Sequence, residues 1–341
     1  MAIARPIPED APTSSTLLPD SLFTICPPFG ATRRFTGVPW RTIAGVRTAS
    51  IDAKQRFRIA GATRRHPVEE TPLPEPALLA EKDAHVLTVT INRPAKKNAV
   101  NAEVLCGLSD AWHRLDDDDE LRVAILTGAG GNFCAGMDLG VIGKLSAGAP
   151  PEDEFEERMA KEMNIIFDGW LKTYRPSKPL IAAVEGFALA GGTEILQGTD
   201  IRVAAESAQF GITEVQRGLF PMAGSTVRLP RQIPYTVAVE MLLTGEPYSA
   251  RQCLEFGLIG HVVPDGQALV EARRIAERIA ANGPLAVRAI LQSIRETASL
   301  PETEAFERKE MAIGMPVFSS EDAREGPRAF LEKRKPVFKG K

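Results

Sequence analysis

The sequence predicts an α/β protein, and three observations support this class. Short apolar runs that end at glycine or proline alternate with segments whose apolar residues recur at helical spacing. The C-terminal third is dominated by helical patterns. Hydrophobic residues make up 44% of the 341-residue chain, which is typical of a globular protein with a sizeable core. Alternation of this kind favours parallel ββα or βαβ units.

The expected elements follow in chain order. A strand is expected in HVLTVTINRP, which alternates and stops at Pro94, and a helix over residues 102–115. Charged residues 116–120 (DDDDE) indicate a solvated turn. One strand each is expected in VAILTGAG, KPLIAAVEGFAL and IRVAAESAQFG, with a short helix in GTEILQGTD. Two amphipathic helices divided at Asn282-Gly283-Pro284, and a last helix capped by Ser319 or Ser320, complete the chain.

Three regions are expected along the chain: 1–74, 75–265 and 266–341. The first 67 residues carry ten Lys or Arg against four Asp or Glu and lack a sustained period, which is typical of disorder. They could be a linker or tail, a transit peptide rich in arginine, or the product of a start codon assigned too early. The last explanation is favoured, with a true start near Val68, because the compact pattern begins abruptly after TPLPEPALL.

Composition excludes several classes of function. A net charge of −3 gives no reason to expect a nucleic-acid partner, and no apolar run is long enough to span a membrane. The four cysteines are scattered without CxxC spacing, which indicates a reducing compartment, and no histidines pair at the spacing of metal ligands. We therefore expect a cytoplasmic protein without a metal site; a mitochondrial location would follow if residues 1–67 were a transit peptide.

The stretch FALAGGTEILQGTD (187–200) is the first candidate for chemistry. Gly191 and Gly192 begin a helix, where backbone N–H groups have no partner within the helix and the helix dipole is positive. Glycine also lets the backbone approach a ligand closely. Gly191 could therefore donate its N–H to a developing oxyanion, with Glu194 nearby in the first turn. A tight strand-to-helix connection that needs glycine for packing explains the same residues equally well.

Two further segments complete the candidate site. In GNFCAGMDLG, Met137 follows Ala135-Gly136 and could supply a second N–H donor. The preceding TGAGG is not a dinucleotide fingerprint, because Phe133 stands where a third glycine is needed. Glu214 lies between a Phe-Gly turn and a partly apolar run, an environment that suits acid–base work near neutral pH. A lone glutamate is usually a surface residue, but two glutamates beside glycine turns could face one small site.

The chain resembles the crotonase superfamily, the enoyl-CoA hydratase/isomerase family, from about residue 75 to the end. The matching motifs, in order, are INRPAKKNAVN (91–101), ILTGAGGNFCAGMDL (125–139), KPLIAAVEGFALAGGTEI (178–195), AQFGITEVQRGLFPMAGS (208–225), LLTGEPYSARQCLEFGLI (242–259) and EGPRAFLEKRKPVF (325–338). Within the family, the chain is most similar to actinobacterial hydratases of lipid or steroid side-chain breakdown. The resemblance implies a crotonase-like spiral of ββα units with a helical C-terminal trimerisation region, as a homotrimer or a dimer of trimers.

The resemblance also implies roles for individual residues. Backbone N–H groups of Met137 and Gly191 would hold the thioester oxygen of an acyl-CoA, and Glu194 and Glu214 would place and activate a water. Both glutamates are present, which favours hydration over isomerisation. The implied contacts to acyl-CoA come from the loop that begins at Arg93, from Lys96 and Lys97, from Ala135, Asp138 and Gly192, and from Lys333, on a neighbouring subunit. Any single one of these lysines is better explained as a solvated surface charge.

The chain departs from the family pattern at two positions. Ala190 replaces the usual third glycine, and Met222 stands where classical hydratases have a glycine whose N–H helps to hold the water. With Met137 and Phe220, Met222 indicates an apolar acyl pocket. The resemblance implies no cofactor, since coenzyme A is part of the substrate. Another crotonase-type reaction (isomerase, dehydratase or hydrolase) and a non-catalytic acyl-CoA-binding protein stay open as alternatives.

Overall fold

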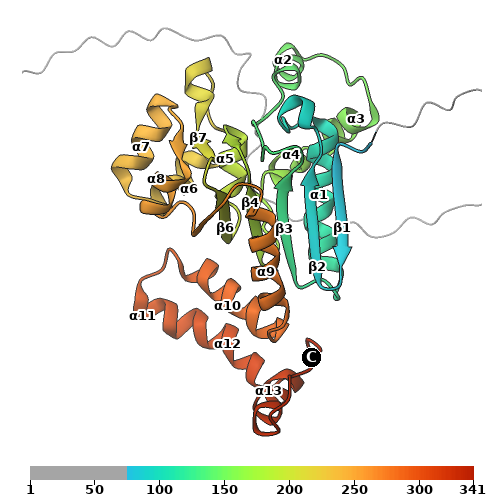
Figure 1. Ribbon diagram of the computed structural model, residues 1–341, viewed down its shortest axis with the longest axis vertical. Coiled ribbons are helices and arrows are strands. Elements are labelled where there is room, and N and C mark those ends of the chain that lie inside the picture. The colour runs from blue at the N-terminus through green and yellow to red at the C-terminus, as the bar shows by residue number, and fades with distance from the viewer. Residues whose placement is uncertain (1–74) are drawn as a thin grey trace, which may run out of the picture. The chain divides into compact units, whose positions relative to one another are not determined.

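The computed structural model describes residues 75–341, so the expectations for residues 1–74 lie outside the described part (Figure 1). The larger sheet has six strands: β1 (Leu78–Asp83), β2 (Val86–Ile91), β3 (Val123–Gly128), β4 (Leu180–Val184), β6 (Ile201–Ala205) and β9 (His261–Val263). They are arranged in the order β1-β2-β3-β4-β6-β9. β1 pairs antiparallel with β2, and every other neighbouring pair in this sheet is parallel.

A smaller sheet contains β5 (Phe187–Leu189), β7 (Gln209–Gly211) and β8 (Tyr248–Ser249), in the order β5-β7-β8. This sheet corrects two expectations. KPLIAAVEGFAL is not one strand but two, β4 and β5, which lie in different sheets. The chain turns between them at Gly186, which has a φ of 54°. Glycine adopts this positive φ without the steric penalty that other residues have. IRVAAESAQFG likewise divides into β6 and β7.

The repeated step from the large sheet to the small sheet and then into a helix produces the expected spiral of ββα units. The helices of this part are α1 (Ala102–Asp117), α2 (Leu139–Ala147), α3 (Glu154–Lys161), α4 (Asn164–Gly169), α5 (Gly191–Leu196), α6 (Ser225–Gln232), α7 (Tyr235–Thr244) and α8 (Ala250–Glu255). Short 3₁₀ turns cover Pro94–Lys96 (η2) and Thr213–Arg217 (η3). Patterns in the sequence did not lead us to expect the strands β1, β8 and β9 or the helices α3, α4, α6, α7 and α8.

Helix α1 confirms the expected helix and shows why it forms. Asn101 accepts a hydrogen bond from the Val104 N–H at 3.1 Å, so it caps the helix N-terminus. Leu105, Leu108 and Trp112 recur at spacings of three and four and are fully buried. The apolar face of α1 therefore packs into the core and fixes the helix beside the sheet.

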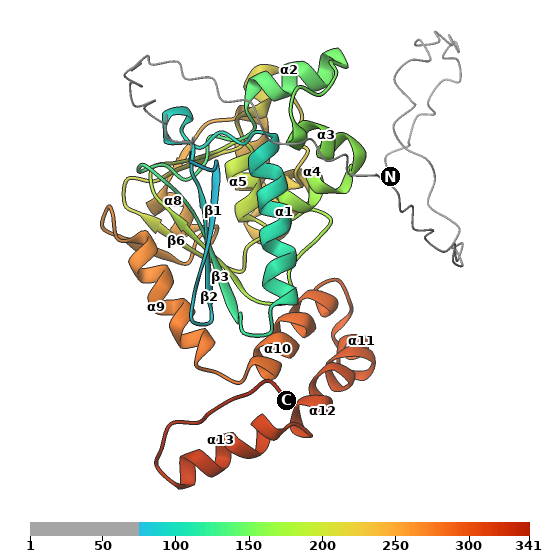
Figure 2. The same cartoon turned by 90° about the vertical axis from the view of Figure 1, so that its right-hand side faces the viewer.

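The two amphipathic helices expected near the C-terminus are α9 (Ala268–Ala280) and α10 (Pro284–Thr297). Buried alanines at every fourth position of α9, from Ala268 to Ala280, let the helix approach the sheet closely. Thus α9 belongs with the sheet, although the sequence places it in the C-terminal region 266–341. Figure 2 shows α9 beside the strands, and α10 to α13 grouped beyond the end of the sheet.

That group comprises α10, α11 (Glu302–Ala305), a π-helical turn η4 (Phe306–Glu310), α12 (Met311–Phe318) and α13 (Glu321–Leu331). Ser320 accepts a hydrogen bond from the Ala323 N–H at 3.0 Å, which confirms the expected cap of α13. Among residues 75–341, no helix is both long and apolar enough to cross a membrane.

Candidate active site

Glu194 lies in the first turn of α5, in the interior of the protein. Its side chain is 3% exposed, and every other residue of α5 is buried as well. Each carboxylate oxygen accepts one backbone hydrogen bond: Oε2 from the Ala223 N–H and Oε1 from the Ser225 N–H, both at 3.1 Å. Hydrogen bonds from two amides favour the ionised form of a buried carboxyl group. These two bonds satisfy both oxygens of the Glu194 carboxyl group and fix its position.

Glu214 lies in a different environment, in the turn η3 that follows β7. Burial raises the pKa of Glu214 to about 8, and the negative charge of the adjacent Glu194 adds to the effect. Its Oε2 is buried and has no hydrogen-bond partner among the described residues. A raised pKa favours the protonated form of Glu214, which can donate a proton. Two adjacent carboxyl groups in different environments are an arrangement typical of acid–base pairs.

The two candidate N–H donors are brought together by the segment that follows β3. Cys134 donates its N–H to the Phe187 carbonyl at 2.9 Å, and its own carbonyl accepts from the Leu189 N–H at 2.9 Å. This pairing lays Gly136 against the start of α5, where a Cβ added to Gly136 would lie 3.1 Å from the Gly191 nitrogen. Met137 is the next residue. Within residues 75–341, neither the Met137 N–H nor the Gly191 N–H donates a hydrogen bond.

Packing accounts for both glycines at the start of α5, since a Cβ on Gly191 would lie 2.7 Å from the ring of Trp170. A Cβ on Gly192 would lie 2.2 Å from the carbonyl oxygen of Cys134, which no real side chain tolerates. The packing explanation thus holds for both glycines. Ala190, in place of glycine, adopts φ 52° and ψ −126°, a conformation that costs a non-glycine residue about 1–3 kcal/mol. The turn that presents the Gly191 N–H is therefore strained and held by its surroundings.

Arg93 and Asp138, both expected to contact substrate, form an ion pair with each other. Two guanidinium nitrogens of Arg93 lie 3.1 Å from Asp138 Oδ2, and Arg93 also donates to the Ala99 carbonyl. Asp138 Oδ1 accepts from the Gly140 N–H at 3.0 Å and caps α2. Backbone bonds from Asp138 to Val100 and from Val100 to Gly136 enclose Met137. The pair fixes the segment that presents the Met137 N–H.

The remaining expected contacts are distributed over the surface. Lys96 and Lys97 are exposed on the turn η2 and just after it, and the Lys97 ammonium lies 4.8 Å from the centre of the Phe187 ring. The Ala135 N–H donates to the Lys97 carbonyl at 3.0 Å, which ties this loop to the donor segment. Lys333 follows α13, in the C-terminal group of helices.

Phe220 and Met222 lie on the loop between η3 and α6, and they are 63% and 57% exposed. Large apolar side chains with that exposure are available to an apolar ligand or to another protein surface. The sequence did not identify the Ala223 and Ser225 amides as partners of Glu194. A signal exists for Ser225 alone, because it is the first residue of α6 and the first amides of a helix have no partner within it.

Comparisons with known proteins identify the family of the chain. The family model for enoyl-CoA hydratase/isomerase matches residues 81–341. The enoyl-CoA hydratase EchA19 of Mycobacterium tuberculosis is 57% identical over 266 residues, which cover 78% of this chain and 97% of that protein. Carnitinyl-CoA dehydratase of Salmonella typhi is 36% identical over 264 residues, covering 76% and 97%. The crystal structure of enoyl-CoA hydratase EchA1 from Mycobacterium marinum has a TM-score of 0.71 at 45% identity and covers 78% of this chain and 100% of that chain. The chain therefore belongs to the enoyl-CoA hydratase/isomerase family and has the crotonase fold.

Proposed function

We propose that this protein is an enoyl-CoA hydratase, which adds water to a 2-trans-enoyl-CoA and gives a 3-hydroxyacyl-CoA. The observation that carries the proposal is the pair of adjacent glutamates in different environments. Glu194 accepts two amide hydrogen bonds, and burial raises the pKa of Glu214 to about 8. Hydration needs one proton acceptor and one proton donor, because the water loses a proton while C2 of the substrate gains one.

In the proposed mechanism the water lies between the two carboxyl groups. Glu194 takes a proton from the water as its oxygen forms a bond to C3, and the electrons of the C2–C3 double bond move toward the thioester. Glu214 then delivers its proton to C2 from the same side, so the addition is syn. The water proton held by Glu194 and the proton lost by Glu214 balance, and exchange with solvent restores the starting states.

The thioester oxygen gains negative charge in this reaction, and the N–H groups of Met137 and Gly191 are the proposed donors that stabilise it. Both are free of protein acceptors within the described residues, and Gly136 joins the segments that carry them. Loss of one donor of this type typically costs about 3–4 kcal/mol of transition-state stabilisation. The mechanism uses no resident cofactor, because coenzyme A enters as part of the substrate.

For the rest of the substrate we propose contacts from residues at the protein surface. Lys96 and Lys97 would lie near the phosphates of coenzyme A, with Ala135 and Gly192 lining the thioester. Phe220 and Met222, both largely exposed, would contact the acyl chain. Acyl chains of fatty-acid or steroid side-chain β-oxidation are the proposed substrates. Cys106, Cys134 and Cys253 are buried free thiols, which supports a reducing compartment such as the cytoplasm.

We further propose a homotrimer or a dimer of trimers, assembled through the C-terminal helices. Ile290 and Ile294 of α10 and Phe318 of α12 are 61%, 60% and 76% exposed. They line a largely apolar groove of about 370 Å³ between these helices. Association with another subunit that covers this groove is favourable, because it removes apolar surface from water. In such an assembly Lys333 could reach coenzyme A bound to a neighbouring subunit. Sedimentation at several concentrations tests the proposal, and a monomer throughout would contradict it.

The first experiment follows the ultraviolet band of the conjugated enoyl thioester with a panel from crotonyl-CoA to long-chain and steroid-like enoyl-CoAs. Loss of the band, with a 3-hydroxyacyl product identified by mass, is the expected result. E194Q and E214Q should each lose most turnover, by about 100-fold or more, while they still bind acyl-CoA. Wild-type turnover in E214Q would exclude the proposed acid.

Dehydration of a hydroxyacyl-CoA is a second candidate, supported by the 36% identity to carnitinyl-CoA dehydratase. It uses the same two groups in reverse, so product analysis from both directions distinguishes the preferred reaction. Double-bond isomerisation would move the double bond without taking up water. Binding of acyl-CoA without any turnover would indicate a binding protein.

A further inference from the structure

Gln197 is a fully buried polar residue directly after α5, one turn beyond Glu194. Its side-chain nitrogen Nε2 donates to Ser225 Oγ at 2.8 Å and to the Thr193 carbonyl at 3.3 Å. Burial of an amide group costs free energy unless the group forms hydrogen bonds such as these. The bond to Ser225 is the shorter of the two, and it joins α5 to a different helix, α6.

Ser225 connects Gln197 to the candidate base. It is the first residue of α6 and is fully buried, and its N–H donates to Glu194 Oε1 at 3.1 Å. The side chain of Ser225 thus bonds to Gln197 while its backbone bonds to Glu194. A shift of Ser225 would therefore move an amide that holds the carboxylate.

Gln197 also contacts the other end of α6. Its backbone carbonyl accepts from Gln232 Nε2 at 2.9 Å, and Gln232 is the last residue of α6. One residue therefore fixes α6 at its first and last positions. Because the helix is held at both ends, the amides at its start keep a defined position relative to α5.

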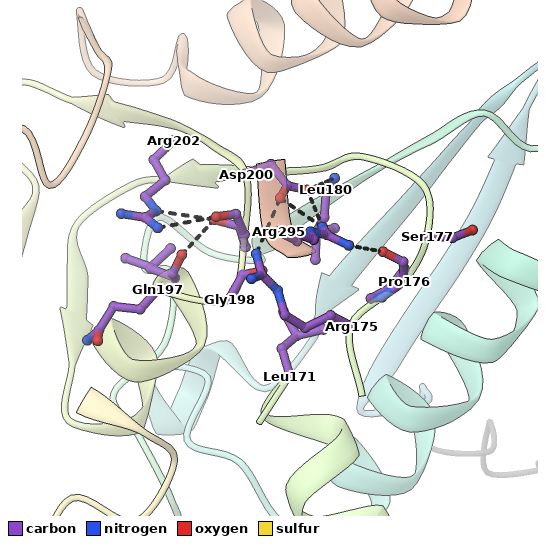
Figure 3. A network of polar contacts seen from close by, with 12 residues as sticks. Leu171, Arg175, Pro176, Ser177, Leu180, Gln197, Gly198, Asp200, Arg202 and Arg295 are labelled. Carbon is purple, nitrogen blue, oxygen red and sulfur yellow. Dashed lines mark hydrogen bonds and ion pairs between the residues drawn. The ribbon is translucent and has the colours of Figure 1, made fainter. Parts of the chain in front are cut away.

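The chain directly after Gln197 is itself held by arginines, as Figure 3 shows. Arg175 donates to the Gly198 carbonyl at 3.2 Å, and Arg295 of α10 pairs with Asp200 at 2.8 Å. Asp200 also accepts from the backbone of β4. These contacts hold residues 197–200 in place. Among these residues, Gln197 forms the hydrogen bonds to α6.

We infer that Gln197 is a positioning residue for Glu194, acting through Ser225 and through the amides of Ala223 and Ser225 beside the start of α6. The inference rests on the proposed hydratase function. Gln197 does not touch the reacting atoms; it determines where the Ala223 and Ser225 N–H groups meet the carboxylate. Displacement of a catalytic group by about 1 Å can lower a rate by about 100-fold.

The test compares Q197M, S225A and the double variant with wild type. Q197M removes the donor, and S225A removes the hydroxyl while it keeps the N–H that binds Glu194. Each single variant should lower kcat by roughly 10- to 100-fold and leave KM for the enoyl-CoA within about twofold. The double variant should be no slower than the slower single variant, because both changes break one connection. Q292M is the matched control, since Gln292 is an exposed glutamine of α10, and its kcat should equal that of wild type.

Several results would overturn the inference. A folded Q197M with wild-type kcat would do so, as would losses in Q197M and S225A that multiply in the double variant. If Q197M does not fold, S225A decides alone by the same kcat and KM criteria. Hydrogen–deuterium exchange of the Ala223 and Ser225 amides gives a readout without turnover: faster exchange in S225A or Q197M supports positioning, and unchanged exchange refutes it. A wild-type protein without hydratase activity would instead reject the proposed function and leave the exchange result to judge the positioning.

Discussion

Replacement of Glu214 by glutamine should make the stability of the protein less dependent on pH. In the folded protein, burial raises the pKa of Glu214 from 4.5 to about 8. In the unfolded chain the same group ionises near its ordinary value. Between these two values the folded state holds a proton that the unfolded state has lost, so the free energy of unfolding falls as pH rises. Glutamine is neutral in both states and removes this effect.

The size of the effect follows from the same interval. Between 4.5 and about 8, a slope of about 1.4 kcal/mol per pH unit amounts to about 5 kcal/mol. We take this value as an upper bound, because water entry and local relaxation reduce the cost of a buried charge. E214Q should therefore match wild type most closely near pH 5. Its relative stability should increase up to about pH 8 and stay constant above it.

Urea unfolding at pH 5, 6.5, 8 and 9, at one fixed protein concentration, measures the difference in the free energy of unfolding between E214Q and wild type. A stability difference between E214Q and wild type that increases with pH and then levels off confirms the raised pKa of Glu214. E81Q is the matched control, because Glu81 is an exposed glutamate of β1, and its difference from wild type should be small at every pH. A difference for E214Q that does not change between pH 5 and pH 8 would refute the reasoning, since it would mean that Glu214 ionises at its ordinary pKa.

Two further predictions concern the segments that present the N–H donors. R93M breaks the 3.1 Å pair with Asp138 and should lower kcat by about tenfold with little change in KM; a raised KM with unchanged kcat would instead show that Arg93 binds substrate. G192A places a Cβ 2.2 Å from the Cys134 carbonyl oxygen and should lower stability by about 1–3 kcal/mol, measured by thermal unfolding. G143A, at a glycine with open space around it, should be tolerated, and equal losses in both variants would contradict the steric argument.

Local patterns in the sequence were sufficient to predict the class of fold and the main helices. Periodicity and capping placed α1, α9, α10 and α13, because the apolar spacing and the caps are properties of neighbouring residues. The same patterns did not separate β4 from β5 or β6 from β7. Each pair is one apolar run interrupted by a turn, and a turn between two sheets depends on what packs against it.

The sequence by itself also determined the candidates for chemistry: two glutamates beside glycine turns and two N–H donors at similar turns. Only the tertiary structure decided their surroundings. The Glu194 carboxyl group accepts hydrogen bonds from the amides of Ala223 and Ser225, about 30 residues away in the chain, and burial together with the charge of Glu194 raises the pKa of Glu214. Arg93, which the sequence placed at the substrate, forms an ion pair with Asp138. The physical reason is the same in each case: charge state and hydrogen bonding depend on neighbours in space, and these neighbours come from distant parts of the chain.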